Sequence, residues 1–178
     1  MNYNSTTDKS IVVSAAQAIS QGISNDGGLF VPMEIPKYSK ADFDAMLTMD
    51  YKGRAKKVIA DYLTDFTAEE VAHCVDNAYT AEKFGGENPA PMVTAKLNGN
   101  EMNILELWHG PTSAFKDMAL QILPYFLTKS LAKKYKGKEA VILVATSGDT
   151  GKAALEGFKD VDGTRIIVFY PQDGVSPM

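Results

Sequence analysis

One uninterrupted apolar run, Ala140–Ala145, constrains the fold of this chain more than any other feature. A charged segment precedes the run, and a polar turn containing glycine follows it. A short apolar run with such borders is typical of a strand covered on both faces, as in a parallel sheet flanked by helices. Strand patterns at 104–107, 140–145 and 165–170 alternate with helical patterns at 114–135 and 151–158. This order predicts an α/β fold with part of a parallel βαβαβ unit.

The first half of the chain has a different pattern, in which helical segments are joined by short loops. Ser14 and Ser39 are expected to cap two of these helices. Thr67 with Glu70 forms a capping-box pattern for a helix expected to run to about Phe84. Glycines and a proline then interrupt the chain at 85–89. We therefore expect a small helical N-terminal domain at 1–95 and a partial α/β domain at 96–178.

Composition excludes several classes of function. The formal net charge is −4, so no basic surface for nucleic acid or an anionic membrane is expected. The single cysteine, Cys74, excludes an internal disulfide and a thiolate metal site, and its apolar helical face predicts a core thiol. No metal site is expected. No stretch is apolar for the ~18 residues that a membrane-spanning helix needs, and the N-terminus lacks a signal-peptide pattern. A cytoplasmic protein is therefore expected.

The segment Glu106–Asp117 joins the first predicted strand to the following helix. In parallel α/β sheets, ligands bind at the carboxyl ends of strands. Gly110 and Pro111 predict a turn, which places Lys116 in the first turn of the helix. A lysine there opposes the helix dipole, and the local field disfavours its charged form. An uncharged amine is what condensation with an aldehyde cofactor requires. Taken alone, a surface lysine at a helix start is the simpler interpretation.

A second segment comprises Ser147, Gly148, Asp149, Thr150 and Gly151, between the second strand and the second helix. The glycines allow close approach of a ligand, and N–H groups at a helix start bind anions or ring oxygens. The glycine–lysine–serine or threonine ending of a nucleotide P-loop is absent. A plain strand-to-helix turn with Asp149 as its cap explains the segment equally well. Because both segments follow predicted neighbouring strands, we expect them to converge on one cleft.

Three segments, in order and at plausible spacing, resemble the signatures of the threonine synthases. They are Asp26–Pro32, Glu106–Asp117 and Ser147–Gly151, and the resemblance covers nearly the whole chain. It corresponds to the first part of a family protein. Threonine synthases are fold-type-II pyridoxal-phosphate lyases of threonine biosynthesis, which convert O-phosphohomoserine and water to threonine and phosphate. The resemblance therefore implies pyridoxal 5′-phosphate as cofactor and O-phosphohomoserine as substrate.

The resemblance also implies roles for individual residues. Lys116 would bind the cofactor covalently and later carry protons, as the catalytic residue. Residues Ser147–Gly151 would lie beside the cofactor, with Asp149 near its ring hydroxyl. His109, Thr112 and Ser113 flank the site without an assigned role. One departure is Thr7, which stands where family members commonly carry an arginine.

The loop that binds the cofactor phosphate lies further along in the family than Met178, the last residue here. We therefore expect a truncated chain that is inactive alone. Two alternatives stay open: another fold-type-II pyridoxal-phosphate lyase, and a non-catalytic interaction domain. With only two helices to cover it, the predicted sheet would be left partly bare, which predicts self-association.

Overall fold

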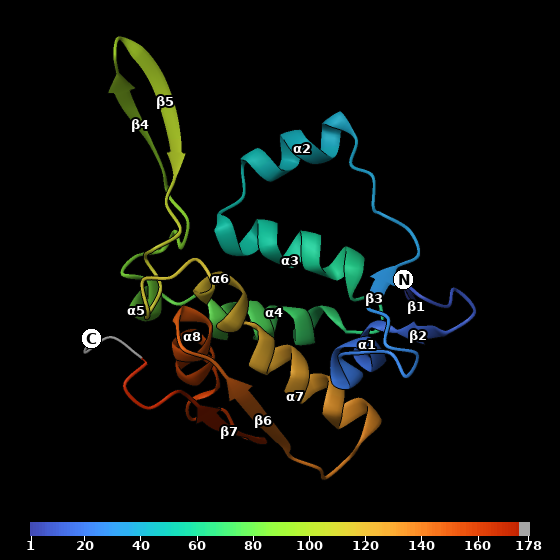
Figure 1. Ribbon diagram of the computed structural model, residues 1–178. Coiled ribbons are helices and arrows are strands. Elements are labelled where there is room, and N and C mark those ends of the chain that lie inside the picture. Colours follow the sequence, from blue (N-terminus) through green and yellow to red (C-terminus); the bar gives the residue numbers. More distant parts are fainter. Residues whose placement is uncertain (175–178) are drawn as a thin grey trace. The chain divides into compact units, whose positions relative to one another are not determined.

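Figure 1 shows the computed structural model, which describes residues 1–174. The chain divides into two compact units. Unit 1 comprises Met1–Asp76 and Tyr125–Ala140, and unit 2 comprises Asn77–Pro124 and the chain from Val141 onward. The domain boundary expected near residue 95 stays a prediction. The expectation for the chain end at Val175–Met178 lies outside the described residues.

Unit 1 contains a small antiparallel sheet that the sequence analysis did not predict. Its order is β2-β1-β3, and Asn4 of β1 pairs with Val12 on one side and Val31 on the other. The strands have only three or four residues each, too few to show a clear alternation of apolar and polar residues. Their bounds are Asn2–Ser5 for β1, Val12–Ser14 for β2 and Phe30–Pro32 for β3.

Side chains fix the starts of the helices in unit 1. Ser14 accepts the Gln17 N–H at the start of α1, and Ser39 forms a full capping box with Asp42 at the start of α2. Both caps were predicted and are confirmed. The helices that lie wholly in this unit are α1 (Ala15–Gln21), α2 (Lys40–Leu47) and α3 (Tyr51–Tyr62); most of α4 (Ala68–Ala78) and of α7 (Leu123–Lys134) also belongs to it.

The start of α2 should be sensitive to acid. Hydrogen bonds from Ser39, first from its hydroxyl and then from its backbone N–H, hold the pKa of Asp42 below its ordinary value of 3.8. A carboxylate whose pKa is lowered by folding stabilises the folded state above the unfolded pKa, and this contribution is lost as the pH falls through the folded pKa. An NMR titration of the Asp42 carboxyl carbon checks this, and a midpoint at or above 3.8 would contradict it.

The predicted capping box at Thr67 is confirmed, but the helix that follows is shorter than expected. The Thr67 N–H donates to Glu70 Oε2 at 2.8 Å, and the Glu70 N–H donates to Thr67 Oγ1 at 3.2 Å. Helix α4 ends at Ala78, and a separate short helix, α5 (Ala81–Phe84), follows. Thr80 explains the second start, because its side chain accepts the Lys83 N–H and caps α5.

The core of unit 1 includes Cys74, whose side chain is fully buried between Val71 and Val75 on α4. The prediction of a core thiol is therefore confirmed. Burial is the main cause that raises the pKa of Cys74 to about 11. Relative to its ordinary pKa of 9.0, this lowers the thiolate fraction at neutral pH roughly 100-fold.

We therefore expect Cys74 to resist alkylation in the folded chain. Its labelling by iodoacetamide at neutral pH should be at least ~100-fold slower than in denaturant, because only the thiolate reacts. Mass spectrometry of timed samples measures both rates. Equal rates in the two conditions would show that the core of unit 1 is not formed.

Unit 2 contains an antiparallel hairpin formed by β4 (Met92–Leu97) and β5 (Asn100–Leu105), which is labelled in Figure 1. It also holds the short helices α5 and α6 (Asp117–Leu120). The strands β6 (Ala140–Ala145) and β7 (Thr164–Phe169) pair with each other, and α8 (Asp149–Phe158) connects them. A helical connection of this kind is what parallel strands require.

The strand predicted at 104–107 lies elsewhere than expected. Its first two residues end β5, which pairs with β4, and in the described part of the chain β6 and β7 form a sheet of two strands. Asn98 and Gly99 explain this, because both have positive φ, of 51° and 82°. Asn-Gly with positive φ at both residues makes the tight hairpin turn that suits twisted strands. Of the predicted βαβαβ order, the described residues therefore contain the second half, β6–α8–β7.

The single helix predicted over 114–135 is two helices. Helix α6 ends at Leu120 and α7 begins at Leu123, directly before Pro124. Proline lacks a backbone N–H, and its ring clashes with the carbonyl four residues earlier, here that of Leu120. The amphipathic spacing continued across this break, so spacing alone could not show it.

In the described part of the chain, no helix has the length and apolar character needed to cross a membrane. No cluster of histidine, cysteine, aspartate and glutamate suited to a metal ion occurs among residues 1–174 either.

Candidate active site

The loop before α6 is folded around a buried carboxylate. Asp117 has no exposed surface, and both of its carboxylate oxygens accept hydrogen bonds from Thr112. The backbone N–H of Thr112 lies 2.8 Å from Oδ2, and its hydroxyl lies 2.8 Å from Oδ1. Gly110 packs on the same side chain, since a Cβ there would lie 2.4 Å from Asp117 Cβ. The Ser113 N–H donates to the Gly110 carbonyl at 3.0 Å, which closes the loop.

Lys116 is the residue at which this loop enters α6. Its carbonyl accepts the Leu120 N–H at 2.9 Å, so its backbone is fixed by the helix. The side chain is half-buried, and Nζ lies 4.3 Å from the centre of the Phe115 ring. Within residues 1–174, the amine forms no ion pair or hydrogen bond. The backbone of the predicted catalytic lysine is therefore fixed by the helix. Its amine pairs with no carboxylate in the described part of the chain.

His109 lies in the same loop and is held on two sides. Its Nε2 lies 2.6 Å from Glu106 Oε2, and its ring stacks on Trp108 with the ring centres 5.7 Å apart. The carboxylate of Glu106 fixes the orientation of the imidazole. These two contacts hold the imidazole of His109 in place within the loop.

The second predicted segment is an open turn between β6 and α8. Gly148 is the N-cap residue of α8, and no side chain caps the helix. Asp149 is already the first helical residue, so the interpretation of Asp149 as the cap is wrong. A Cβ on Gly148 would meet no atom within 4 Å, whereas one on Gly151 would lie 1.9 Å from Thr146 Cγ2. At this helix start the Gly148 N–H donates to Thr146 Oγ1 and the Gly151 N–H donates to the Gly148 carbonyl. The N–H groups of Asp149 and Thr150 are therefore the ones that could meet an anionic or oxygen-bearing ligand.

Both segments belong to unit 2, and the helices that follow them are in contact. Helix α6 follows Lys116 and α8 follows the turn; a Cβ on Gly157 of α8 would lie 2.2 Å from the carbonyl oxygen of Leu120. This close approach ties the two segments to one packed pair of helices. Their convergence on a single cleft stays a prediction.

The third motif, Asp26–Pro32, has a structural role in unit 1. The carboxylate of Asp26 accepts the Ser5 hydroxyl at 2.9 Å and the Gly28 N–H at 3.1 Å. Gly28 has no room for a side chain, because a Cβ there would lie 2.1 Å from Ser5 Oγ and 2.8 Å from Thr7 Oγ1. The motif thus joins the turn before β3 to the end of β1. Thr7, where an arginine was expected, lies beside this turn.

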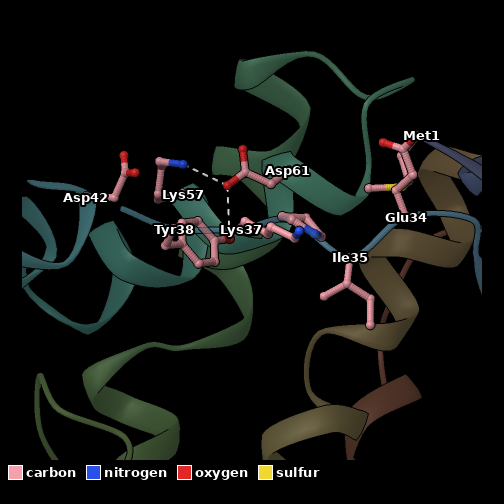
Figure 2. A pocket seen from close by; sticks show the side chains of 9 residues that line it. Met1, Glu34, Ile35, Lys37, Tyr38, Asp42, Lys57 and Asp61 are labelled. Atoms are coloured by element: carbon pink, nitrogen blue, oxygen red, sulfur yellow. Dashed lines mark hydrogen bonds and ion pairs between the residues drawn. The ribbon is translucent and has the colours of Figure 1, made fainter. Parts of the chain in front are cut away.

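A hollow of about 710 Å³ lies within unit 1, and Figure 2 shows its lining. The Tyr38 hydroxyl donates to Asp61 Oδ2 at 3.0 Å, and Lys57 pairs with the same carboxylate at 2.7 Å. Burial, and then the hydrogen bond and charge of Asp61, raise the pKa of Tyr38 to about 12. None of the site residues predicted from the sequence lines this hollow.

Two carboxylates of the site were missed by the sequence analysis as individual residues. Asp117 organises the loop, and Glu106 orients His109. The spacing from Thr112 to Asp117 is not that of a capping box, so no local pattern marks this pair. Only the folded loop shows that the carboxylate next to Lys116 points inward.

An α/β unit with a lysine at the start of one helix and an open glycine turn before the next is that of the fold-type-II pyridoxal-phosphate proteins. The fold agrees with solved structures of this class. Within the class, the chain is similar to the threonine synthases and matches their N-terminal portion over nearly its whole length.

Three comparisons show this similarity. Residues 2–79 match the family model described as threonine synthase N terminus. The chain is 36% identical to the threonine synthase of Pseudomonas aeruginosa over 177 residues, which is 99% of this chain and 36% of that protein. It superposes with a TM-score of 0.90 on a pyridoxal-phosphate-bound threonine synthase from Brucella melitensis, at 35% identity, covering 99% of this chain and 37% of the other. The chain thus spans about 36% of the length of the curated relative.

Proposed function

We propose that this chain is the N-terminal part of a threonine synthase and that Lys116 is the amine that binds pyridoxal 5′-phosphate. The observation that carries the proposal is the half-buried amine, free of any carboxylate partner among residues 1–174, on a loop organised by Asp117. The substrate would be O-phosphohomoserine, and the products threonine and phosphate. We expect the chain to be inactive alone, because it spans about 36% of the length of the curated relative. A cytoplasmic location stays a prediction.

The residues present fit this cofactor. Condensation with an aldehyde requires an uncharged amine, whereas a carboxylate partner would stabilise the charged ammonium form. Lys116 has no such partner among residues 1–174. The ring oxygen and other anionic groups require N–H donors, which the uncapped start of α8 supplies. Gly148 leaves open space at that point. When bound, the cofactor supplies an electron sink for carbanion chemistry.

The chain's own residues would orient the substrate and move protons. The Lys116 amine, once released from the aldehyde, can accept a proton from one substrate carbon and then serve the neighbouring carbon. This is what loss of a phosphate group from the γ-carbon requires. The hydroxyls of Ser147 and Thr150 would hold the substrate carboxylate, and Asp149 would face the ring hydroxyl.

Covalent trapping tests the proposal directly. The full chain is incubated with pyridoxal 5′-phosphate, reduced with borohydride and mapped by mass spectrometry. We expect the modification on Lys116, its loss in Lys116→Ala and its retention in Lys152→Ala, which removes an exposed lysine of α8. Modification spread evenly over the surface lysines would contradict the proposal.

The bare sheet supports a second function, that of an interaction domain. Alternate residues of β6 and β7 are exposed, and they include the charged Arg165 and four large apolar residues: Val141, Leu143, Ile167 and Phe169. Contiguous apolar surface with an unpaired edge favours association. We infer that the chain self-associates through this surface, whether or not it binds the cofactor.

Light scattering after size exclusion tests this inference. We expect dimers or larger species that become monomeric in the double variant Leu143→Lys with Phe169→Lys. The control is Leu47→Lys, which changes an exposed leucine of α2 and should leave the association unchanged. A monomeric parent chain at ~100 μM would remove the support for an interaction domain.

A further inference from the structure

We infer that Asp117 is the positioning residue that fixes the direction of the Lys116 side chain, an inference that rests on the function proposed for Lys116. The two residues are neighbours at the point where the loop enters α6. Asp117 is completely buried, whereas Lys116 is half-buried. Successive residues at a helix start point about 100° apart, so anchoring one side chain inward turns the other away from the packed interior.

The anchoring is specific because a buried carboxylate is costly unless it is hydrogen-bonded. Thr112 supplies two donors to Asp117, one to each oxygen, both at 2.8 Å. Hydrogen bonds to an ionised acceptor are among the stronger ones in proteins. The same threonine lies in the turn that precedes the helix. The hydrogen bond therefore closes a ring of the chain between Thr112 and Asp117, and Lys116 lies within this ring.

The backbone of the ring shows that it is held in place. Ser113 has a φ of 57°, in the left-handed region that a residue other than glycine adopts only when its surroundings impose it. Gly110 must be glycine, because a Cβ would lie 2.5 Å from Asp117 Oδ2. Both features serve to bring the loop onto the carboxylate of Asp117.

Helix stability does not explain the position of Asp117. An acidic residue in the first turn is stabilised by the helix dipole, but α6 has only four residues and so only a small dipole. An exposed carboxylate at this position would be stabilised as much without the free-energy cost of desolvation. The free-energy cost of burying this carboxylate is explained if its hydrogen bonds hold the loop in place. The loop in turn presents one lysine, whose backbone carbonyl is fixed by Leu120.

Two reactions of Lys116 separate positioning from general stability. Reductive methylation by formaldehyde reports how accessible the amine is, and borohydride trapping of pyridoxal 5′-phosphate reports productive placement. In Asp117→Ala we expect methylation of Lys116 to become faster, relative to Lys152 in the same chain, and trapping to become at least ~10-fold slower, since small misplacements of a reacting group are costly. General unfolding would raise the methylation of both lysines.

The threonine gives a milder pair of variants should Asp117→Ala fail to fold. Thr112→Val removes the hydroxyl donor and keeps the N–H, and we expect trapping ~3-fold slower or more, whereas Thr112→Ser should restore the parent rate. The positioning role is overturned if the parent traps the cofactor on Lys116 while the folded variants leave both rates within ~2-fold. If the parent traps nothing but methylation of Lys116 still responds to Asp117→Ala, the cofactor function fails and the positioning role stands.

Discussion

Replacing Phe84 by alanine should destabilise unit 2 by about 3–5 kcal/mol, because deletion of a buried phenyl ring leaves a cavity that its surroundings fill only in part. Phe84 is 2% exposed and lies at the end of α5. Its ring packs against Tyr79 with centres 5.8 Å apart, and the Tyr79 hydroxyl donates to the Met118 carbonyl in α6 at 2.7 Å. The substitution should therefore loosen the helix that follows Lys116.

Chemical denaturation followed by circular dichroism measures this change. Phe115→Ala is the matched control, because Phe115 is 62% exposed and its loss should cost less than about 1 kcal/mol. A native domain is stable by only about 5–15 kcal/mol, so the Phe84 variant should unfold at markedly lower denaturant. Equal midpoints for the two variants would show that α5 does not contribute to the core of unit 2.

Replacing Gly157 by alanine should also destabilise unit 2, although the same change usually stabilises an exposed helix by about 1 kcal/mol. The new Cβ would lie 2.2 Å from the carbonyl oxygen of Leu120 and 2.9 Å from its carbonyl carbon. Both are backbone atoms, so no side chain can rotate to relieve the clash. Forced overpacking of this kind costs about 1–3 kcal/mol and occasionally more.

The Gly157 substitution has a second expected consequence, for the site. Helices α6 and α8 follow Lys116 and the Ser147–Gly151 turn, and their separation would move the two apart. The rate of borohydride trapping of pyridoxal 5′-phosphate on Lys116 should therefore fall together with the stability of unit 2. Gly86→Ala serves as the control, since a Cβ there meets no atom within 4 Å. An unchanged melting temperature for Gly157→Ala would contradict the close packing of these helices.

The features that were predicted correctly depend on local chemistry. The caps at Ser14, Ser39 and Thr67 are recognisable because a side-chain oxygen must satisfy helix N–H groups within three residues. The same holds for the buried thiol of Cys74, whose neighbours at helical spacing are apolar. These short-range rules predicted the starts of α1, α2 and α4.

The features that were missed depend on residues that override a periodic pattern or act at a distance. Pro124 divides a helix whose apolar spacing is continuous, and Asn98 with Gly99 turns a strand into a hairpin. The inward direction of Asp117 depends on its contact with Thr112, which no spacing rule describes. The site residues therefore stay predictions that come from the resemblance, and the organisation of the loop around Lys116 required the structure.

The most direct test of the account is an NMR titration of the ¹⁵N-labelled full chain with pyridoxal 5′-phosphate. If Lys116 and the turn at 147–151 form one cofactor site, the amide signals of Gly148, Thr150 and Gly151 should shift together with that of Lys116. In Lys116→Ala these shifts should weaken at the same cofactor concentration. Shifts confined to residues around Tyr38 in the hollow of unit 1, with residues 147–151 unaffected, would contradict the central claim.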